Sequence, residues 1–364
     1  MSSSVENDSP EVKAMLQRIE EFMQDPPRPD RSESRTMKLN DVAWTDWIDL
    51  DERYSEQLDC KLEYHGSENT VVVTLGRSNV QQSLHVLLKP FSAIVHAADG
   101  FHLQYNVGLF TGSRPSRGVF IPDLTVTKDG VYNVAEPRFL QLPQYPIVFE
   151  CGDPLSSFED LRGKIPQYLD GTRGLLAVVC LFLHGEPYRN PPASYPVGLP
   201  KEPSDIKWEP REPLGDVTFE GHTWAPGIRE ITMEIYRNTD PVTVKKIDGL
   251  KPAVITIPAT EDSSVEDQRA EVEHILGVLL QRTMTVETYV SHSGDGLELD
   301  WDGWLVYLDR EVQLDAYDRY LRWMPPQVPS CPVKDEDEIP EREYLEGPRL
   351  KQLRLMKESR AGQV

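Results

Sequence analysis

The segment from Ile121 to Leu183 constrains the fold of this chain more than any other part of the sequence. It contains an apolar strand that begins near Asp123, a second apolar strand that ends near Glu150, a polar segment with helical character, and the apolar run Leu175–Leu183. A run that is apolar at nearly every position is typical of a strand covered on both faces of a sheet. The order of these elements predicts an α/β fold with a mixed central sheet flanked by helices.

The sequence before this segment predicts two helices and two strands. Ser9, followed by a proline, is a favourable helix start, and the apolar residues after it recur on one helical face. That face must pack against this chain or against another. Thr70–Leu75 and Phe101–Val107 have the pattern of strands, and Asn79–Ala98 has that of a helix that Pro90 is expected to kink.

The sequence after this segment begins with a proline-rich stretch and then predicts a mixture of strands and helices. Eight prolines lie between Pro187 and Pro213, which is typical of an extended linker. One helix is predicted to begin at Ser264, and another to cover Gln313–Trp323. The predicted strands are Val217–Phe219, Ile228–Tyr236, Thr243–Ile247, Ala253–Ile257, Val286–Val290 and Trp304–Leu308.

Composition limits the classes of function and the compartment. The 364 residues, 39% of them hydrophobic, are expected to form a folded core. No apolar run reaches the ~18 residues of a membrane span, and the N-terminus has no secretory signal, so no membrane association is expected. The four cysteines have no CxxC spacing, which indicates reduced thiols of an intracellular protein, cytoplasmic or nuclear. A net charge of −22 argues against a protein that coats nucleic acid, because phosphate neutralisation drives such binding.

Two carboxylates and a lysine in the central segment suggest a metal site. Asp123 and Glu150 fall on neighbouring predicted strands, and Lys164 follows in the polar segment. Carboxylate oxygens are the ligands that Mg²⁺ prefers, and a bound divalent ion activates water for attack on a phosphodiester. A nearby lysine orients that water or stabilises the charge that develops on the phosphate.

The same residues resemble a known nuclease family. In order, they are Pro122, Asp123, Glu150, Pro154, Asp160, Lys164 and Tyr168. This series is similar to the PD-(D/E)XK nuclease superfamily, and its spacing resembles the Uma-type restriction-endonuclease-like family. The resemblance implies a metal-dependent endonuclease that hydrolyses the phosphodiester bonds of DNA, with a restriction-endonuclease-like core and an elaborated C-terminal region.

The resemblance also implies roles for individual residues. Asp123, Glu150 and the carbonyl of Cys151 are expected to bind Mg²⁺ or Mn²⁺, and Lys164 to act on the attacking water. Asp160 and Tyr168 are expected to support the site. One feature departs from the superfamily: its usual lysine lies two residues after the Glu, where this chain has Gly152.

The sequence then divides into five regions. These are an N-terminal helix and linker (1–35), a PD-(D/E)XK nuclease-like core (36–185), a proline-rich linker (186–215), a C-terminal α+β region (216–330) and a charged tail (331–364). Whether the C-terminal region is a separate domain or an extension of the same core is left open. The N-terminal helix and the tail are candidates for binding a protein partner or a second copy of the chain.

Two alternatives remain beside the nuclease. The first is a catalytically inactive protein of the same fold that acts as a protein-interaction scaffold, which Gly152 and the charge of −22 favour. Gly163 and Pro166 point the same way, because they weaken the helix that carries Lys164. The second is an unrelated α+β binding protein in which the pattern is a coincidence, and it predicts that Asp123 and Glu150 lie far apart.

Overall fold

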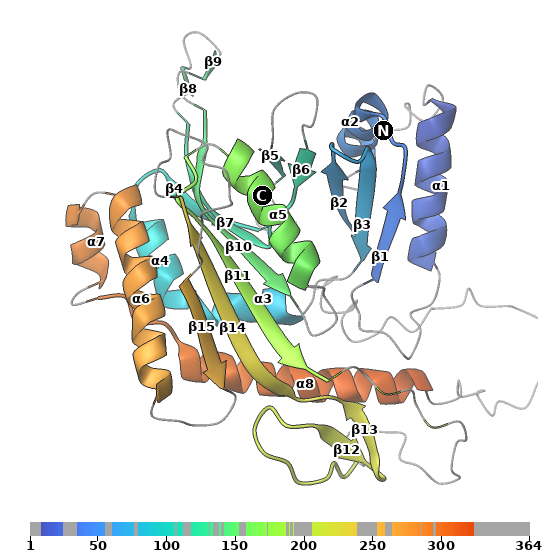
Figure 1. Cartoon of the computed structure of the whole chain (residues 1–364), viewed down its shortest axis with the longest axis vertical. Helices are drawn as coiled ribbons and strands as arrows, with labels where there is room; N and C mark the ends of the chain where they lie inside the picture. Colours follow the sequence, from blue (N-terminus) through green and yellow to red (C-terminus); the bar gives the residue numbers. More distant parts are fainter. Residues whose placement is uncertain are drawn as a thin grey trace, which may run out of the picture. The chain divides into compact units, whose positions relative to one another are not determined.

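The computed structural model divides the chain into two units, Met1–Met324 and Pro325–Val364, and all described residues belong to the first (Figure 1). They are residues 9–24, 35–54, 60–75, 79–105, 108–111, 118–130, 132–133, 138–139, 142–152, 158–172, 174–186, 189, 192, 206–238, 253–258, 264–284, 286–293 and 296–323. The predicted tail, 331–364, and the predicted strand Thr243–Ile247 lie outside the described residues.

Six strands form the central sheet, in the order β15-β14-β11-β10-β7-β4. Their bounds are β4 (Phe101–Gln104), β7 (Leu124–Lys128), β10 (Gln144–Gly152), β11 (Ala177–Gly185), β14 (Ile228–Arg237) and β15 (Ala253–Pro258). β10 and β11 are parallel, and the other neighbouring strands are antiparallel. Because β14 pairs with β11, the C-terminal region extends the sheet that the central segment begins.

Helices cover both faces of this sheet. On one face, α5 (Phe158–Gly171) packs through Leu161 and Ile165 against Val148 and Val178. The other face is covered by α3 (Asn79–Leu87), α4 (Lys89–Ala97), α6 (Ser264–Thr283), α7 (Val286–Ser293) and α8 (Trp301–Trp323) (Figure 1). A mixed sheet between helical layers confirms the predicted α/β class.

A second, five-stranded sheet has the order β1-β3-β2-β6-β5. Its strands are β1 (Arg35–Leu39), β2 (Cys60–His65), β3 (Thr70–Leu75), β5 (Leu109–Thr111) and β6 (Gly118–Phe120). Two helices, α1 (Pro10–Gln24) and α2 (Trp44–Tyr54), share its apolar core. Two short antiparallel pairs complete the strands: β8 (Tyr132–Asn133) with β9 (Arg138–Phe139), and β12 (Val217–Phe219) with β13 (His222–Ala225).

The apolar face of α1 packs inside the chain. Val12, Met15 and Ile19 are buried in one cluster with Trp47 of α2. The helix begins as predicted, since Ser9 Oγ accepts a hydrogen bond from the Val12 N–H at 3.1 Å. The sequence is equally compatible with a partner chain that covers this face. In the structure, α2 and the five-stranded sheet cover it.

Proline breaks the helix predicted over Asn79–Ala98 into two. α3 ends at Leu87, α4 begins at Lys89, and Pro90 occupies the first turn of α4. A proline is tolerated there because the backbone N–H that it lacks has no partner within the helix. The predicted kink is therefore a complete interruption.

Two strand predictions near the C-terminus are wrong. Val286–Val290 lies in α7 and Trp304–Leu308 lies in α8. The buried side chains of Trp301, Trp304 and Leu308 recur at helical spacing, and Asp300 Oδ1 caps the helix by accepting the Gly303 N–H at 3.0 Å. A short apolar run does not distinguish a buried strand from a buried helix, and here the cap decides for the helix.

Within the described ranges, none of the helices combines the length and the apolarity that a membrane span requires.

Candidate functional site

Strand pairing brings Asp123 and Glu150 to the same place. Phe149 of β10 is paired with Leu124 of β7, and the two strands are antiparallel. Glu150, one residue after Phe149, therefore lies opposite Asp123, one residue before Leu124. Both side chains are buried, with about 2% of their surface exposed. This proximity is the opposite of what the coincidence alternative predicts.

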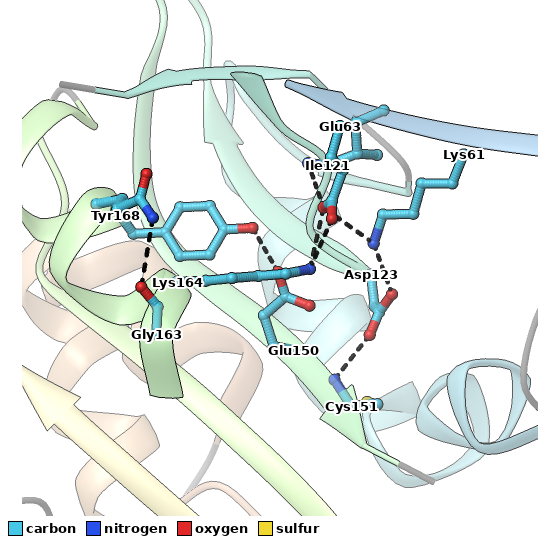
Figure 2. Close-up of polar contacts among 10 residues, drawn as sticks. Lys61, Glu63, Ile121, Asp123, Glu150, Cys151, Gly163, Lys164 and Tyr168 are labelled. Carbon is cyan, nitrogen blue, oxygen red and sulfur yellow. Dashed lines mark hydrogen bonds and ion pairs between the residues drawn. The ribbon is translucent and has the colours of Figure 1, made fainter. Parts of the chain in front are cut away.

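Asp123 is engaged through both of its carboxylate oxygens (Figure 2). Its Oδ2 accepts the backbone N–H of Cys151 at 2.7 Å, and its Oδ1 lies 3.3 Å from Lys61 Nζ. The sequence predicts that the Cys151 carbonyl is a metal ligand. In the structure the N–H of Cys151 contacts Asp123, and Cys151 is paired with Leu181 of β11.

Helix α5 delivers Lys164 and Tyr168 to the same cluster. Lys164 Nζ lies 3.0 Å from both oxygens of Glu63 and 3.7 Å from Glu150 Oε1. The Tyr168 hydroxyl donates a hydrogen bond to Glu150 Oε1. The two side chains are one helical turn apart, and they project from the same face of α5. Asp160, one turn before Lys164, is exposed and is not among the buried members of the cluster.

Gly163 and Pro166 do not interrupt α5, which runs continuously from Phe158 to Gly171. A Cβ at Gly163 would meet nothing within 4 Å, so the glycine is not required by a close contact. The packing of Leu161, Ile165 and Leu169 in the core outweighs the local cost of these two residues.

Two members of the cluster, Lys61 and Glu63, are not among the residues predicted from the sequence. Both lie on β2, where alternation sends Leu62 and Tyr64 into the core of the five-stranded sheet and Lys61 and Glu63 to its opposite face. Glu63 also accepts the Ile121 N–H at 3.0 Å. A signal was present, because a charged residue between two core positions on a strand indicates a polar partner on the other face.

The cluster contains more negative than positive groups. Three carboxylates, those of Glu63, Asp123 and Glu150, face the two ammonium groups of Lys61 and Lys164. The carboxylates have 2–3% of their surface exposed and the lysines 15%. Bulk solvent therefore screens these charges little. When Glu150 is ionised, the carboxylates outnumber the ammonium groups by one.

The pKa values follow from this arrangement. Burial raises the pKa of Glu150 to about 7, although the two lysines oppose the shift. Burial would also raise the pKa of Glu63, but Lys164 and Lys61 outweigh it and hold that pKa at about 2. Burial alone would lower the pKa of each lysine, but the carboxylates outweigh it, so both pKa values are raised and both lysines stay charged.

Glu234 is a further buried acid on the same face of the six-stranded sheet as Glu150. Glu150, Cys180 and Glu234 are cross-strand neighbours on β10, β11 and β14. Glu234 binds the guanidinium of Arg162 from α5 and accepts the Tyr236 hydroxyl at 2.7 Å. Lys164 and Arg162 thus attach α5 to two buried glutamates, one on each side of Cys180.

Asp123 and Glu150 are the two carboxylates of the cluster that could hold a divalent cation. In the part of the chain that the structure describes, no three His, Cys, Asp or Glu side chains form a group that could hold a metal ion. Asp123 and Glu150 together supply two carboxylates, and Mg²⁺ binds in sites of one or two carboxylates because it keeps several of its waters.

No protein-family model matches this chain, and a comparison with curated proteins found no match.

Proposed function

We propose that this chain is a metal-dependent nuclease with a PD-(D/E)XK-like, restriction-endonuclease-like core, and that it hydrolyses phosphodiester bonds of DNA. The observation that carries the proposal is the buried Asp123–Glu150 pair on adjacent strands, with Lys164 beside it. Such a pair is costly to bury unless a cation balances it.

In this proposal, Asp123 and Glu150 hold Mg²⁺ or Mn²⁺. The ion supplies a bound water of lowered pKa and polarises the phosphate. Lys164, which Glu63 holds at 3.0 Å, stabilises the charge that develops on the phosphate or orients the water. Tyr168 fixes the orientation of Glu150 through its hydroxyl. Because the net charge of −22 repels DNA at long range, DNA binding is expected to depend on the metal.

Cleavage of supercoiled plasmid and of single-stranded DNA with Mg²⁺ or Mn²⁺ tests the proposal. Glu150→Gln and Lys164→Met are each expected to lower the cleavage rate by at least about a hundredfold, a typical loss for a group that stabilises the transition state. Glu159→Gln is the matched control, because Glu159 is exposed at the start of α5. Equal cleavage by wild type and the two site variants would identify a contaminating nuclease, and no cleavage with either metal would contradict the proposal.

One observation favours the scaffold alternative. The two lysines already neutralise two of the three carboxylates, and the carboxylates have only 2–3% of their surface exposed. In a scaffold, this network serves to join β2, β10 and α5. The two functions differ in their response to Glu150→Gln: a nuclease loses activity, whereas a scaffold keeps the partner that a pull-down with the wild-type chain recovers.

A further inference from the structure

Lys61 contacts the carboxylate that the proposed function assigns to the metal. It projects from β2, and its Nζ lies 3.3 Å from Asp123 Oδ1 and 3.6 Å from Glu63 Oε1 (Figure 2). With 15% of its side chain exposed, it is close to the surface but largely shielded from water. A positive charge thus lies beside the oxygen that a metal ion would use.

The surroundings of Asp123 show which partner a metal would displace. Oδ2 accepts the Cys151 N–H at 2.7 Å, and that backbone is fixed because Cys151 pairs with Leu181 inside the sheet. Oδ1 faces Lys61, whose ammonium is at the end of a flexible chain. A metal ion that binds Asp123 would therefore displace the Lys61 ammonium and leave the Cys151 N–H in place.

The two lysines of the cluster are not equivalent. Lys164 lies 3.0 Å from both oxygens of Glu63, whereas Lys61 is 3.6 Å from the nearer one. If Lys61 moves away from Asp123, Glu63 still keeps Lys164 as its nearest positive group. Lys164 cannot be removed in the same way, because both Glu63 and Glu150 face it.

Given the proposed function, we infer that Lys61 is an internal cation that competes with the divalent metal for Asp123 and thereby sets the metal affinity of the site. Without metal, Lys61 balances the charge of Asp123. While the Lys61 ammonium stays beside Oδ1, its positive charge repels the metal ion. Binding of the metal would therefore require the ammonium to move away from Oδ1. Metal enters the site only at concentrations that overcome this competition.

Measurement of free Mn²⁺ by electron paramagnetic resonance tests the inference. Lys61→Met keeps most of the side-chain volume and removes the charge, and it is expected to lower the Kd for Mn²⁺ by at least about tenfold, because a charge within ~4–6 Å changes ionic equilibria by this much. Lys38→Met, on the exposed face of β1, is the matched control and leaves the Kd unchanged. An unchanged or higher Kd for Lys61→Met would refute the inference.

The outcomes separate this inference from the proposed function. If the wild type binds Mn²⁺, Asp123→Asn does not, and Lys61→Met binds like the wild type, the metal site stands and the inference fails alone. If neither the wild type nor Lys61→Met binds Mn²⁺, the proposed function fails as well.

A second measurement uses the wild type and does not depend on the folding of a variant. Lysine acylation followed by mass spectrometry reports the accessibility of each ammonium. Saturating Mn²⁺ is expected to increase the labelling of Lys61 and to leave that of Lys38 unchanged. Labelling of Lys61 that stays constant or falls while Mn²⁺ binds would show that the metal does not displace it.

Discussion

Replacing Glu63 with Gln keeps the size of the side chain and removes the negative charge that Lys164 and Lys61 share. In the wild type, Lys164 lies 3.0 Å from both oxygens of Glu63, and the Ile121 N–H donates to it at 3.0 Å. The variant leaves the two lysines with the carboxylates of Asp123 and Glu150 alone. We therefore expect Glu63→Gln to destabilise the fold.

The pKa of Glu63 gives the magnitude. A pKa of about 2, against an ordinary value of 4.5, corresponds to about 3 kcal/mol of stabilisation at neutral pH. Because Gln still accepts hydrogen bonds, the expected loss in free energy of unfolding is about 2–3 kcal/mol. A carboxyl with a lowered pKa stabilises the fold fully above its ordinary pKa, and this contribution disappears as the pH falls from 4.5 to about 2.

Urea unfolding, followed by tryptophan fluorescence, measures the difference between wild type and variant. The difference is expected to be largest at neutral pH and smaller at a pH between the two pKa values of Glu63. Glu68→Gln, exposed in the turn after β2, is the control and changes stability by less than about 0.5 kcal/mol. Pairing of Glu63 with the two lysines predicts both the size of the stability loss and its pH dependence. A loss below about 1 kcal/mol at neutral pH, or an equal loss at both pH values, would contradict this pairing.

Three further variants test other parts of the structure by the same unfolding assay. Tyr168→Phe removes the hydroxyl that donates to Glu150 and is expected to cost about 1–2 kcal/mol, so a neutral effect would contradict that contact. Arg162→Met leaves the buried Glu234 carboxylate without its guanidinium partner and is expected to cost about 1–2 kcal/mol. This cost is lower than for a fully buried pair because half of the Arg162 side chain is exposed. A more stable variant would contradict a stabilising role of the ion pair. Ser9→Ala removes the N-cap of α1 and is expected to cost about 1 kcal/mol, whereas no change would show that the cap is dispensable.

Local patterns predicted most of the elements that position the site. The cap at Ser9, the strand pattern of Thr70–Leu75 and the almost wholly apolar run Leu175–Leu183 each correspond to an element of the structure. These features depend on neighbours in sequence, and propensity and periodicity describe such neighbours well. The helix that carries Lys164 and Tyr168 forms despite Gly163 and Pro166, because its buried face compensates for them.

The remainder of the cluster depends on contacts that are distant in sequence. Lys61 reaches Asp123 across 62 residues, and Lys164 reaches Glu63 across 101. No local pattern encodes which strand of the second sheet lies beside the carboxylates. The error at Trp304–Leu308 has a different cause: a short apolar run fits either a strand or a helix, and the local cap at Asp300 decides for the helix.

A calorimetric titration tests whether Asp123 and Glu150 bind a divalent metal. Mg²⁺ and Mn²⁺ are titrated into the wild type and into the double variant Asp123→Asn, Glu150→Gln, with a thermal melt of each protein at saturating metal. The wild type is expected to show one metal-binding event and a raised Tm, both absent from the double variant. The absence of binding in the wild type, or equal binding in both proteins, would contradict metal binding by these two carboxylates.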